Sequence, residues 1–274
     1  MTRRVAFAIA ILLALAWSLG PVLWQILTAI KPDAQITHAP LVYWPHPPTG
    51  EHFRAIWERK PFGLYLLNST FIAFFAALLC LVFATPAAMA LARLLPRDRD
   101  RVLLTFLVLS LFPPILLLFP LYEAVRGLGW INQPVALVVP YAALHLPLAV
   151  WVLESGFRSI PVSIDEAARL DGLSVVRRLV RVLAPLATPS IVTAGILVFI
   201  FAWNEFMLAV TFLTRDQAKT VTAGIASVSG ASLYEIPWGP LCAAITLATL
   251  PLFVLVLVFQ RRIVSGLTRG AVKG

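Results

Sequence analysis

The sequence contains six long apolar stretches, and each is close to the length that a helix needs to cross a lipid bilayer. They cover residues 5–30, 63–92, 102–122, 134–153, 186–213 and 237–260. A hydrocarbon core about 30 Å thick requires ~20 apolar residues in helical conformation. Because a backbone surrounded by lipid must satisfy its own hydrogen bonds, such stretches predict α-helices. We therefore predict an all-α, polytopic membrane protein with six transmembrane helices in a single domain, residues 1–274.

The composition excludes an ordinary soluble domain. The chain is 60% hydrophobic and 13% charged, whereas soluble domains carry about 25% charged residues. Its net charge of +9 would indicate nucleic-acid binding in a soluble protein. Here the basic residues are spread over several short loops between apolar stretches, so we predict no nucleic-acid partner and a lipid environment instead.

The distribution of Lys and Arg predicts the orientation in the membrane. With the N-terminus inside, 15 of the 22 basic residues fall in the inner segments and seven in the outer segments. Cytoplasmic loops carry the excess of basic residues in membrane proteins. We predict that both termini lie inside, in a multi-pass protein of the cytoplasmic membrane.

The first apolar stretch also resembles a signal peptide. Two arginines precede it, and Ala14-Leu15-Ala16 has the form of a cleavage site. The stretch continues apolar to Ile30, which favours an uncleaved first helix.

The outer segment 31–62 is rich in Pro and Trp and too polar to span the membrane. We predict a structured loop near the interface. It contains His38, His46 and His52, which lack the close spacing of metal ligands, so we predict no metal site.

The inner loop 156–185 is predicted to form two short helices. Ser163 and Glu166 fit a capping box at the start of the first helix, and Gly172 fits its end. Ser174 is a plausible N-cap for the second helix, which Pro185 is expected to stop. Such a hairpin fits either a partner's groove or an anionic lipid surface, and spacing alone leaves both open.

The same loop carries a family resemblance. Glu166-Ala167-Ala168, Gly172 after three intervening residues, and Val182-Leu183-Ala184-Pro185 resemble the EAA loop of membrane subunits of bacterial ATP-binding-cassette importers. The family pattern ends Ile-x-Leu-Pro, so Val182 and Ala184 depart from it. Residues 201–206, Phe-Ala-Trp-Asn-Glu-Phe, and the terminal Gly-Ala-Val-Lys-Gly are similar to the maltose and trehalose type of permease subunit.

This resemblance implies a sugar-transport subunit without enzymatic activity of its own. The expected partners are a second, homologous permease, a dimer of ATPase subunits and an extracytoplasmic sugar-binding protein. No Gly-x-x-x-x-Gly-Lys-Ser/Thr motif occurs in the chain, so ATP and Mg²⁺ are expected on the ATPase and no cofactor on this chain. The residues that the resemblance assigns to ATPase coupling are Glu166, Ala167, Ala168, Asp171, Gly172 and Pro185. The tail, residues 261–274, offers a second contact through Gly266, Thr268 and Gly270, or is an ordinary basic tail.

Polar and aromatic residues within the spans are candidates for the sugar pathway, because buried polar groups in a membrane usually face a cavity. They are Trp203, Asn204, Glu205, Tyr141 and His145, with Asn68 and Ser69 as further candidates. Glu205 could instead contact the partner permease or lie at a helix end. Trp203 fits packing better than sugar stacking, and His145 fits a bond to a carbonyl freed by a proline. Eight prolines within the spans predict either kinks or broken helices.

Two other functions fit less well. The same importer family also carries cargo such as glycerol phosphate or compatible solutes, but no basic residue lies deep in a span. A proton-coupled secondary transporter would have only Glu205 and His145 for a relay, and it would give the inner loop no purpose.

Overall fold

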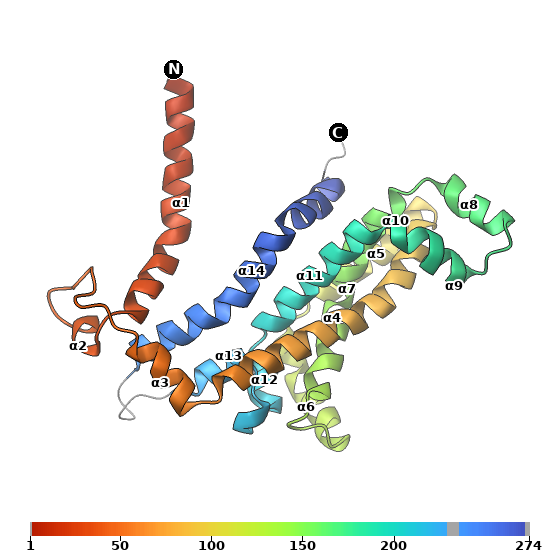
Figure 1. Cartoon of the computed structure of the whole chain (residues 1–274). Coiled ribbons are helices and arrows are strands. Elements are labelled where there is room, and N and C mark those ends of the chain that lie inside the picture. The colour runs from red at the N-terminus through yellow and green to blue at the C-terminus, as the bar shows by residue number, and fades with distance from the viewer. Residues whose placement is uncertain (1, 229–235, 272–274) are drawn as a thin grey trace. The chain divides into compact units, whose positions relative to one another are not determined.

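The computed structural model describes residues 2–228 and 236–271, with side chains described for residues 4–228 and 236–261, and every regular element in these ranges is a helix (Figure 1). The chain divides into two compact units. Unit 1 comprises residues 1–65 and 224–252, and unit 2 comprises residues 66–223 and 253–274. Two long helices, α4 (Phe62–Ala92) and α14 (Trp238–Ala271), contribute to both units.

Within the described residues, four helices are long and apolar enough to cross a membrane: α1 (Thr2–Ala29), α4, α7 (Val135–Arg158) and α14. They match four of the predicted stretches. The number rises to as many as six if each of two bent helix pairs forms one span. These pairs are Pro96–Ser110 with Pro114–Gly127, bent by 78°, and Val175–Leu186 with Thr188–Asn204, bent by 85°.

The remaining elements are short or belong to these bent pairs. They are α2 (Asp33–Ile36), α3 (Glu51–Arg59), α5 (Pro96–Ser110), η1 (Pro114–Leu117), α6 (Leu118–Gly127), α8 (Val162–Leu170), α9 (Val175–Arg178), η2 (Leu179–Leu183), α10 (Ala184–Leu186), α11 (Thr188–Asn204), α12 (Met207–Phe212), η3 (Asp216–Ala218) and α13 (Val221–Ala226).

The stretch 102–122 is interrupted, which is the broken-helix alternative predicted for the prolines within the spans. The chain leaves α5 at Ser110 and resumes in the 3₁₀ turn η1 at Pro114. Pro113 and Pro114 are adjacent, and each lacks an N–H and disfavours helix in the residue before it. Five other prolines remain inside continuous helices, namely Pro21, Pro86, Pro140, Pro147 and Pro251.

The stretch 186–213 is also interrupted. Helix α11 ends at Asn204 and α12 begins at Met207, so Glu205 and Phe206 form a short break between them. Because an unpaired backbone group is costly in an apolar environment, this break requires partners from elsewhere in unit 2.

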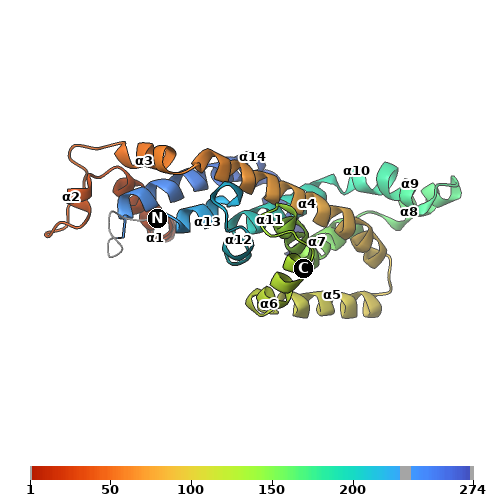
Figure 2. The ribbon, with the colours of Figure 1, turned by 90° about the horizontal axis from the view of Figure 1, so that it is seen from below.

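The core of unit 2 is built where α4, α7 and α11 lie side by side (Figures 1 and 2). Small residues allow the close approach. A Cβ added at Gly156 of α7 would lie 2.2 Å from Ser190 Oγ of α11, and one added at Gly195 would lie 3.0 Å from Leu81 of α4. Small residues at such crossings are typical of helices packed in membranes.

In unit 1, the predicted outer loop 31–62 contains the two short helices α2 and α3. His52 of α3 is buried, and its Nε2 donates a hydrogen bond to the carbonyl of Lys31 at 2.7 Å. The Lys31 ammonium lies 4.0 Å from the centre of the Trp24 ring, and burial lowers the pKa of Lys31. His52 thus packs the loop. Within the described residues, no group of three or more His, Cys, Asp or Glu could hold a metal ion.

The contact between Gly156 and Ser190 gives a first prediction. Replacing Gly156 with Ala should destabilise the folded chain by about 1–3 kcal/mol, because a well-packed crossing must open to admit the methyl group. Adding Ser190→Gly should restore most of the loss, since the nearest remaining atom, the Cα of residue 190, is 4.0 Å away. Thermal unfolding of the purified chain in detergent measures both effects.

The matched control is Gly127→Ala in α6, where an added Cβ meets nothing within 4 Å. If Gly156→Ala unfolds at the same temperature as Gly127→Ala, the close α7–α11 crossing is refuted.

Candidate functional site

The loop predicted to contain two helices forms a helical hairpin, α8 followed by α9. Its first helix begins two residues earlier than expected, at Val162, with Pro161 at the N-cap position and no side-chain capping bond. The predicted capping box of Ser163 and Glu166 was therefore wrong. Pro161 starts the helix because its fixed φ suits a helix start and it has no N–H to satisfy, and Ser163 consequently lies inside the first turn.

The end of α8 was predicted correctly. Gly172 has a φ of +78°, the left-handed conformation in which glycine is favoured. Its N–H donates to the carbonyl of Arg169, and the N–H of Leu173 donates to the carbonyl of Ala168. These two bonds form a Schellman motif, which closes the helix and turns the chain toward α9.

The second helix begins as predicted, with Ser174 at the N-cap position, although its side chain forms no capping bond. It does not stop at Pro185. The chain passes through the π-helical turn η2, in which the N–H of Ala184 donates to the carbonyl of Leu179 five residues back, and α10 ends at Leu186. The wider π-helical turn lets the helix continue up to a residue that has no N–H to donate.

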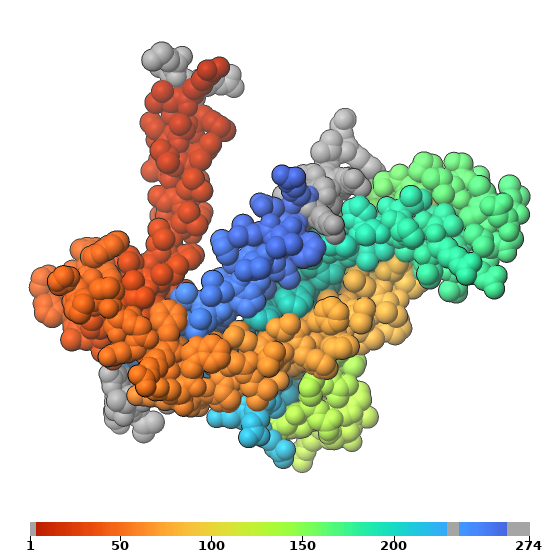
Figure 3. All heavy atoms as spheres, in the orientation of Figure 1, coloured from red at the N-terminus to blue at the C-terminus, as the bar shows by residue number. Residues whose placement is uncertain are grey.

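The hairpin presents apolar and charged residues on its exposed surface, at one end of unit 2 (Figures 1 and 3). Leu170 is 89% exposed, and Val162, Val175, Val176 and Val180 are exposed as well. Five of the six predicted coupling residues are also exposed, namely Glu166, Ala167, Asp171, Gly172 and Pro185. Ala168 is only 5% exposed, so its methyl group packs inside the hairpin, whereas it was expected beside Ala167 in a partner's cleft.

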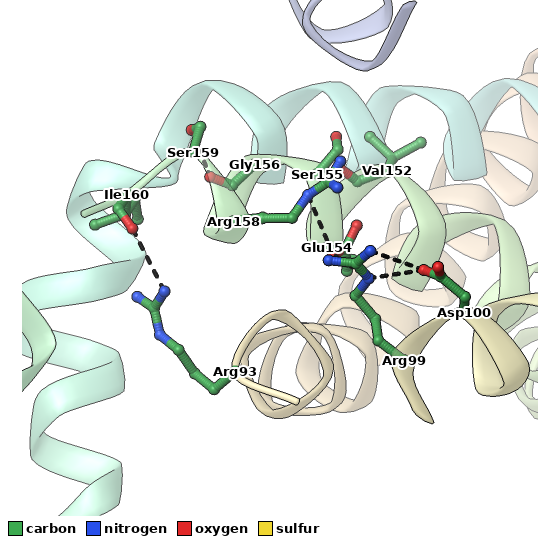
Figure 4. Close-up of polar contacts among 10 residues, drawn as sticks. All are labelled: Arg93, Arg99, Asp100, Val152, Glu154, Ser155, Gly156, Arg158, Ser159 and Ile160. Carbon is green, nitrogen blue, oxygen red and sulfur yellow. Dashed lines mark hydrogen bonds and ion pairs between the residues drawn. The ribbon is translucent and has the colours of Figure 1, made fainter. Parts of the chain in front are cut away.

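Beneath this surface lies a buried ion-pair group that sequence reasoning missed. The carboxylate of Asp165 in α8 lies 3.3 Å from Arg93 Nε, just after α4, and 3.3 Å from Arg178 Nη1 in α9. Arg93 also donates from Nη1 to the carbonyl of Ile160 at 3.4 Å (Figure 4). Asp165 lies between Ser163 and Glu166, the residues of the predicted capping box. No local spacing indicates its distant partner Arg93.

A second buried carboxylate lies at the end of α7. Glu154 is 3% exposed, and its Oε1 lies 3.4 Å from Arg158 Nε and 3.7 Å from Arg99 Nε (Figure 4). Arg99 in turn pairs with Asp100 at 2.8 Å. The spacing of Glu154 and Arg158 by four residues is the one local signal for this group. It was missed because the predicted span ended at Leu153, before the helix does.

A cavity of about 490 Å³ lies in unit 2 between α5 with η1, α7 and α11. Its lining is mainly apolar and aromatic. Polar groups come from Ser110, His145 and Glu205, and aromatic groups from Phe112, Trp151 and Phe201. Two predicted pathway residues, His145 and Glu205, therefore face the same cavity.

Glu205 holds the break between α11 and α12. Its carboxylate accepts hydrogen bonds from the N–H groups of Leu208 and Ala209, at 3.0 and 3.2 Å, and from the Tyr141 hydroxyl at 2.5 Å. The backbone carbonyl of Glu205 accepts a hydrogen bond from the Thr222 hydroxyl at 2.8 Å. The side chain thus caps the start of α12 and ties it to α7, which matches the helix-end alternative while leaving Glu205 at the cavity wall.

Trp203 and Asn204 do not line the cavity. Trp203 is buried and stacks on Phe199, as the packing interpretation predicted. Asn204 donates to the carbonyl of Ile200 in its own helix. The buried Nε2 of His145 has no hydrogen-bond partner in the described part of the chain, so the predicted bond from this atom to a freed carbonyl is not formed.

Asn68 and Ser69 anchor the segment that leads into α13. The Asn68 amide donates to the carbonyls of Gln217 and Lys219, and the Ser69 hydroxyl accepts from the N–H of Val221. These contacts give both residues a structural role.

Comparison with known proteins identifies the family. Residues 84–269 match the family described as binding-protein-dependent transport system inner membrane component. The chain belongs to this family. Its members are transport components of the inner membrane, which agrees with the apolar helices described above.

Several relatives in this family are similar over nearly the whole chain. The chain is 38% identical to the trehalose/maltose transport system permease protein MalG of Thermococcus litoralis and 37% identical to the trehalose transport system permease protein SugB of Mycobacterium tuberculosis, each over 99% of this chain and 98% of the relative. It is also 37% identical to the sulfoquinovosyl glycerol transport system permease protein SmoH of Agrobacterium fabrum, over 97% of this chain and 93% of that protein.

A solved structure shares the fold. It is a chain from the crystal structure of a bacterial ABC transporter involved in the import of the acidic polysaccharide alginate, with a TM-score of 0.77 and 21% identity over 94% of this chain and 96% of that chain. The fold of this family member is therefore that of a known importer.

The predicted tail contact falls partly outside the described residues. Gly266, Thr268 and Gly270 belong to the last turns of α14. The side-chain surroundings of residues 262–274 lie outside the description, so the tail contact stays a prediction.

The Tyr141–Glu205 hydrogen bond gives a second prediction. Tyr141→Phe removes one donor to a carboxylate and should destabilise the chain by about 1.5–3 kcal/mol. Thermal unfolding in detergent measures the loss, with Tyr122→Phe as the control, because the Tyr122 ring packs against Phe212 rather than beside Glu205. An effect no larger than that of the control would contradict the assigned role of Tyr141.

Proposed function

We propose that this chain is a permease subunit of an ABC importer that moves a neutral di- or oligosaccharide, of the trehalose or maltose kind, across the cytoplasmic membrane. The observation that carries the proposal is the exposed α8–α9 hairpin, which combines a docking surface with a rigid attachment to the helices. The similarity to the trehalose and maltose permeases over 99% of the chain supports the choice of cargo.

The hairpin is proposed to contact a separate ATPase subunit. Its exposed apolar side chains, such as Leu170 and Val176, would be unfavourable in water unless a partner covers them. Glu166 is exposed and forms no ion pair with any described residue. The carboxylate is therefore free to face a basic group of the ATPase, while Ala167 permits close approach. The alternative, an amphipathic hairpin lying on anionic lipid, has less support because Arg178 points inward to Asp165.

The proposed topology has six spans with both termini inside. Each bent pair then contributes one span, and α9 with α10 lies along the inner surface before α11 enters the membrane. Arg93, Arg99 and Arg158 lie near one another at the hairpin end of unit 2 (Figure 4), and Arg178 shares Asp165 with Arg93. This grouping supports the proposed sidedness, because basic residues gather on the cytoplasmic side.

The cavity between α5, α7 and α11 is proposed to be part of the sugar pathway. Sugars bind to hydrogen-bonding groups and to aromatic faces, and this lining offers Ser110, His145 and Glu205 beside Trp151 and Phe201. Tyr141, which is not among the lining residues, donates a hydrogen bond to the Glu205 carboxylate.

The charge of the cavity favours a neutral cargo. Among the described residues that line it there is no Lys or Arg, and the one charged group is the Glu205 carboxylate. An anionic cargo, such as glycerol phosphate or a sulfonated sugar, would face repulsion there. The 37% identity to the sulfoquinovosyl glycerol permease is the specific observation that favours the anionic alternative.

Co-purification of the tagged chain from its native membrane, followed by an ATPase assay, tests the proposal. We expect an ATPase, a second permease and a binding protein to accompany the chain, and hydrolysis to rise with trehalose or maltose. Stimulation by sulfoquinovosyl glycerol alone would select the anionic alternative. Purification of the chain alone, with transport driven by a proton gradient, would indicate a secondary transporter.

The hairpin contact predicts the effect of a charge reversal. Glu166→Lys should leave the chain in the membrane but abolish sugar-stimulated ATP hydrolysis, because it places a cation where a basic partner group is expected. The control is Glu123→Lys, which reverses an exposed charge on α6. Normal stimulation in Glu166→Lys would remove the hairpin from the ATPase contact.

The pathway assignment predicts the effect of filling the cavity. Ser110→Trp should lower sugar uptake into reconstituted vesicles while the ATPase still co-purifies, because an indole would occupy space between α5 and α7. Leu104→Trp is the control, since Leu104 is on the same helix, is exposed and does not line the cavity. Equal uptake by the two variants would place the pathway elsewhere.

A further inference from the structure

The attachment of α8 to the rest of unit 2 depends on unusually few buried side chains. Of the nine residues of α8, two are buried, Asp165 and Ala168. The alanine buries a single methyl group, which can contribute only a small hydrophobic stabilisation. Ile164 packs, partly buried, against the core of unit 2, and the buried charged contact of this helix is the carboxylate of Asp165.

The partners of Asp165 come from two different parts of the chain. Arg178 belongs to α9, the second helix of the hairpin, whereas Arg93 directly follows α4. Arg93 also donates to the carbonyl of Ile160, directly before the hairpin (Figure 4). One carboxylate thus joins both helices of the hairpin to the end of a membrane-spanning helix.

The connection continues along the chain to α5 and α7. Six residues after Arg93, Arg99 of α5 reaches the buried Glu154 of α7. Helix α5 also lines the 490 Å³ cavity through Leu107, Leu109 and Ser110. The short segment between α4 and α5 therefore lies between the hairpin and the helices that surround the cavity.

We propose that Asp165 is a positioning residue that makes α8, α9 and the end of α4 move as one body, so that movement of the hairpin reaches the helices around the cavity. This inference rests on the proposed function, because it assumes that the ATPase moves the hairpin. Asp165 itself lies beneath the exposed surface and does not touch the ATPase.

The charge balance of the group explains why the carboxylate is needed. Without it, Arg93 and Arg178 would face each other across a largely buried space with no anion between them. Removing one partner of a buried ion pair leaves an uncompensated charge, which is far costlier than removing both. The side chains should then separate, and α8 should lose its fixed position relative to α4.

The first test measures this position directly. Spin labels at Ser163→Cys of α8 and Leu95→Cys, both exposed positions outside the apolar surface proposed to contact the ATPase, report the distance from α8 to the α4–α5 connection in the whole complex in nanodiscs. The background carries Cys80→Ala and Cys242→Ala. We expect a narrow distance distribution in the parent and a broad one with Asp165→Asn.

The second test measures coupling in the same complexes. Asp165→Asn should leave the ATPase bound and hydrolysing ATP, while sugar uptake per ATP falls about fivefold or more, the lower end of measured couplings between sites. Adding Arg178→Gln should recover part of the loss and narrow the distances, because it removes one of the two opposed charges. Asp98→Asn, which removes an exposed carboxylate on the same α4–α5 side, is the control.

The outcomes separate this inference from the proposed function. The inference is overturned if Asp165→Asn shows normal sugar uptake per ATP or a narrow distance distribution while Glu166→Lys still abolishes sugar-stimulated ATP hydrolysis. Loss of the ATPase from both Asp165→Asn and the double variant also overturns it, because Asp165 would then act in binding. Normal coupling in Glu166→Lys refutes the hairpin contact itself, whatever Asp165→Asn does.

Discussion

The structure depends on one constraint: a backbone in an apolar environment must find hydrogen-bond partners within the protein. Continuous helices such as α4 and α7 meet it locally. Where the helix is interrupted, a side chain takes over. The Glu205 carboxylate caps the start of α12, and the backbone carbonyl of Glu205 accepts a hydrogen bond from the Thr222 hydroxyl. The Ser69 hydroxyl accepts a hydrogen bond from the first N–H of α13. The interruption at Glu205 is thus a fixed point of the fold, and the cavity lies beside it and beside the break between α5 and η1.

Charge has two uses in this chain. Basic residues are concentrated in the segments predicted to face the cytoplasm, as the positive-inside rule requires. Several of them also form buried ion pairs, with Asp165 and Glu154 as the acidic partners. A surface ion pair contributes little to stability, whereas a buried one fixes geometry, because separating the partners strands a charge. The topology signal and the hairpin's attachment therefore share the same arginines.

Much of the fold was predictable because it follows from local chemistry. Apolar length predicted four long helices, and Gly172 predicted the end of α8. The error at the hairpin arose because Pro161 starts α8 earlier than Ser163 would, so the predicted capping box does not form. At Pro113 and Pro114 the sequence left a kink or a break open, and the structure has a break. At the candidate site, His145 and Glu205 were found because polar residues in apolar stretches are conspicuous. Asp165 and Glu154 were missed because their partners are distant in sequence or beyond a predicted boundary.

The sequence by itself determined the class of protein, its apolar helices, the family and the hairpin with its glycine turn, since each depends on composition or on residues within a few positions. Only the tertiary structure decided that Glu205 is satisfied by Tyr141 and α12, that Asn68 and Ser69 hold a loop, and that Asp165 joins the hairpin to α4. The physical reason is the separation along the sequence between the residues that interact. Hydrophobicity and helix ends are properties of a local segment, whereas the neutralisation of a buried charge depends on which distant residue the fold brings within a few ångströms.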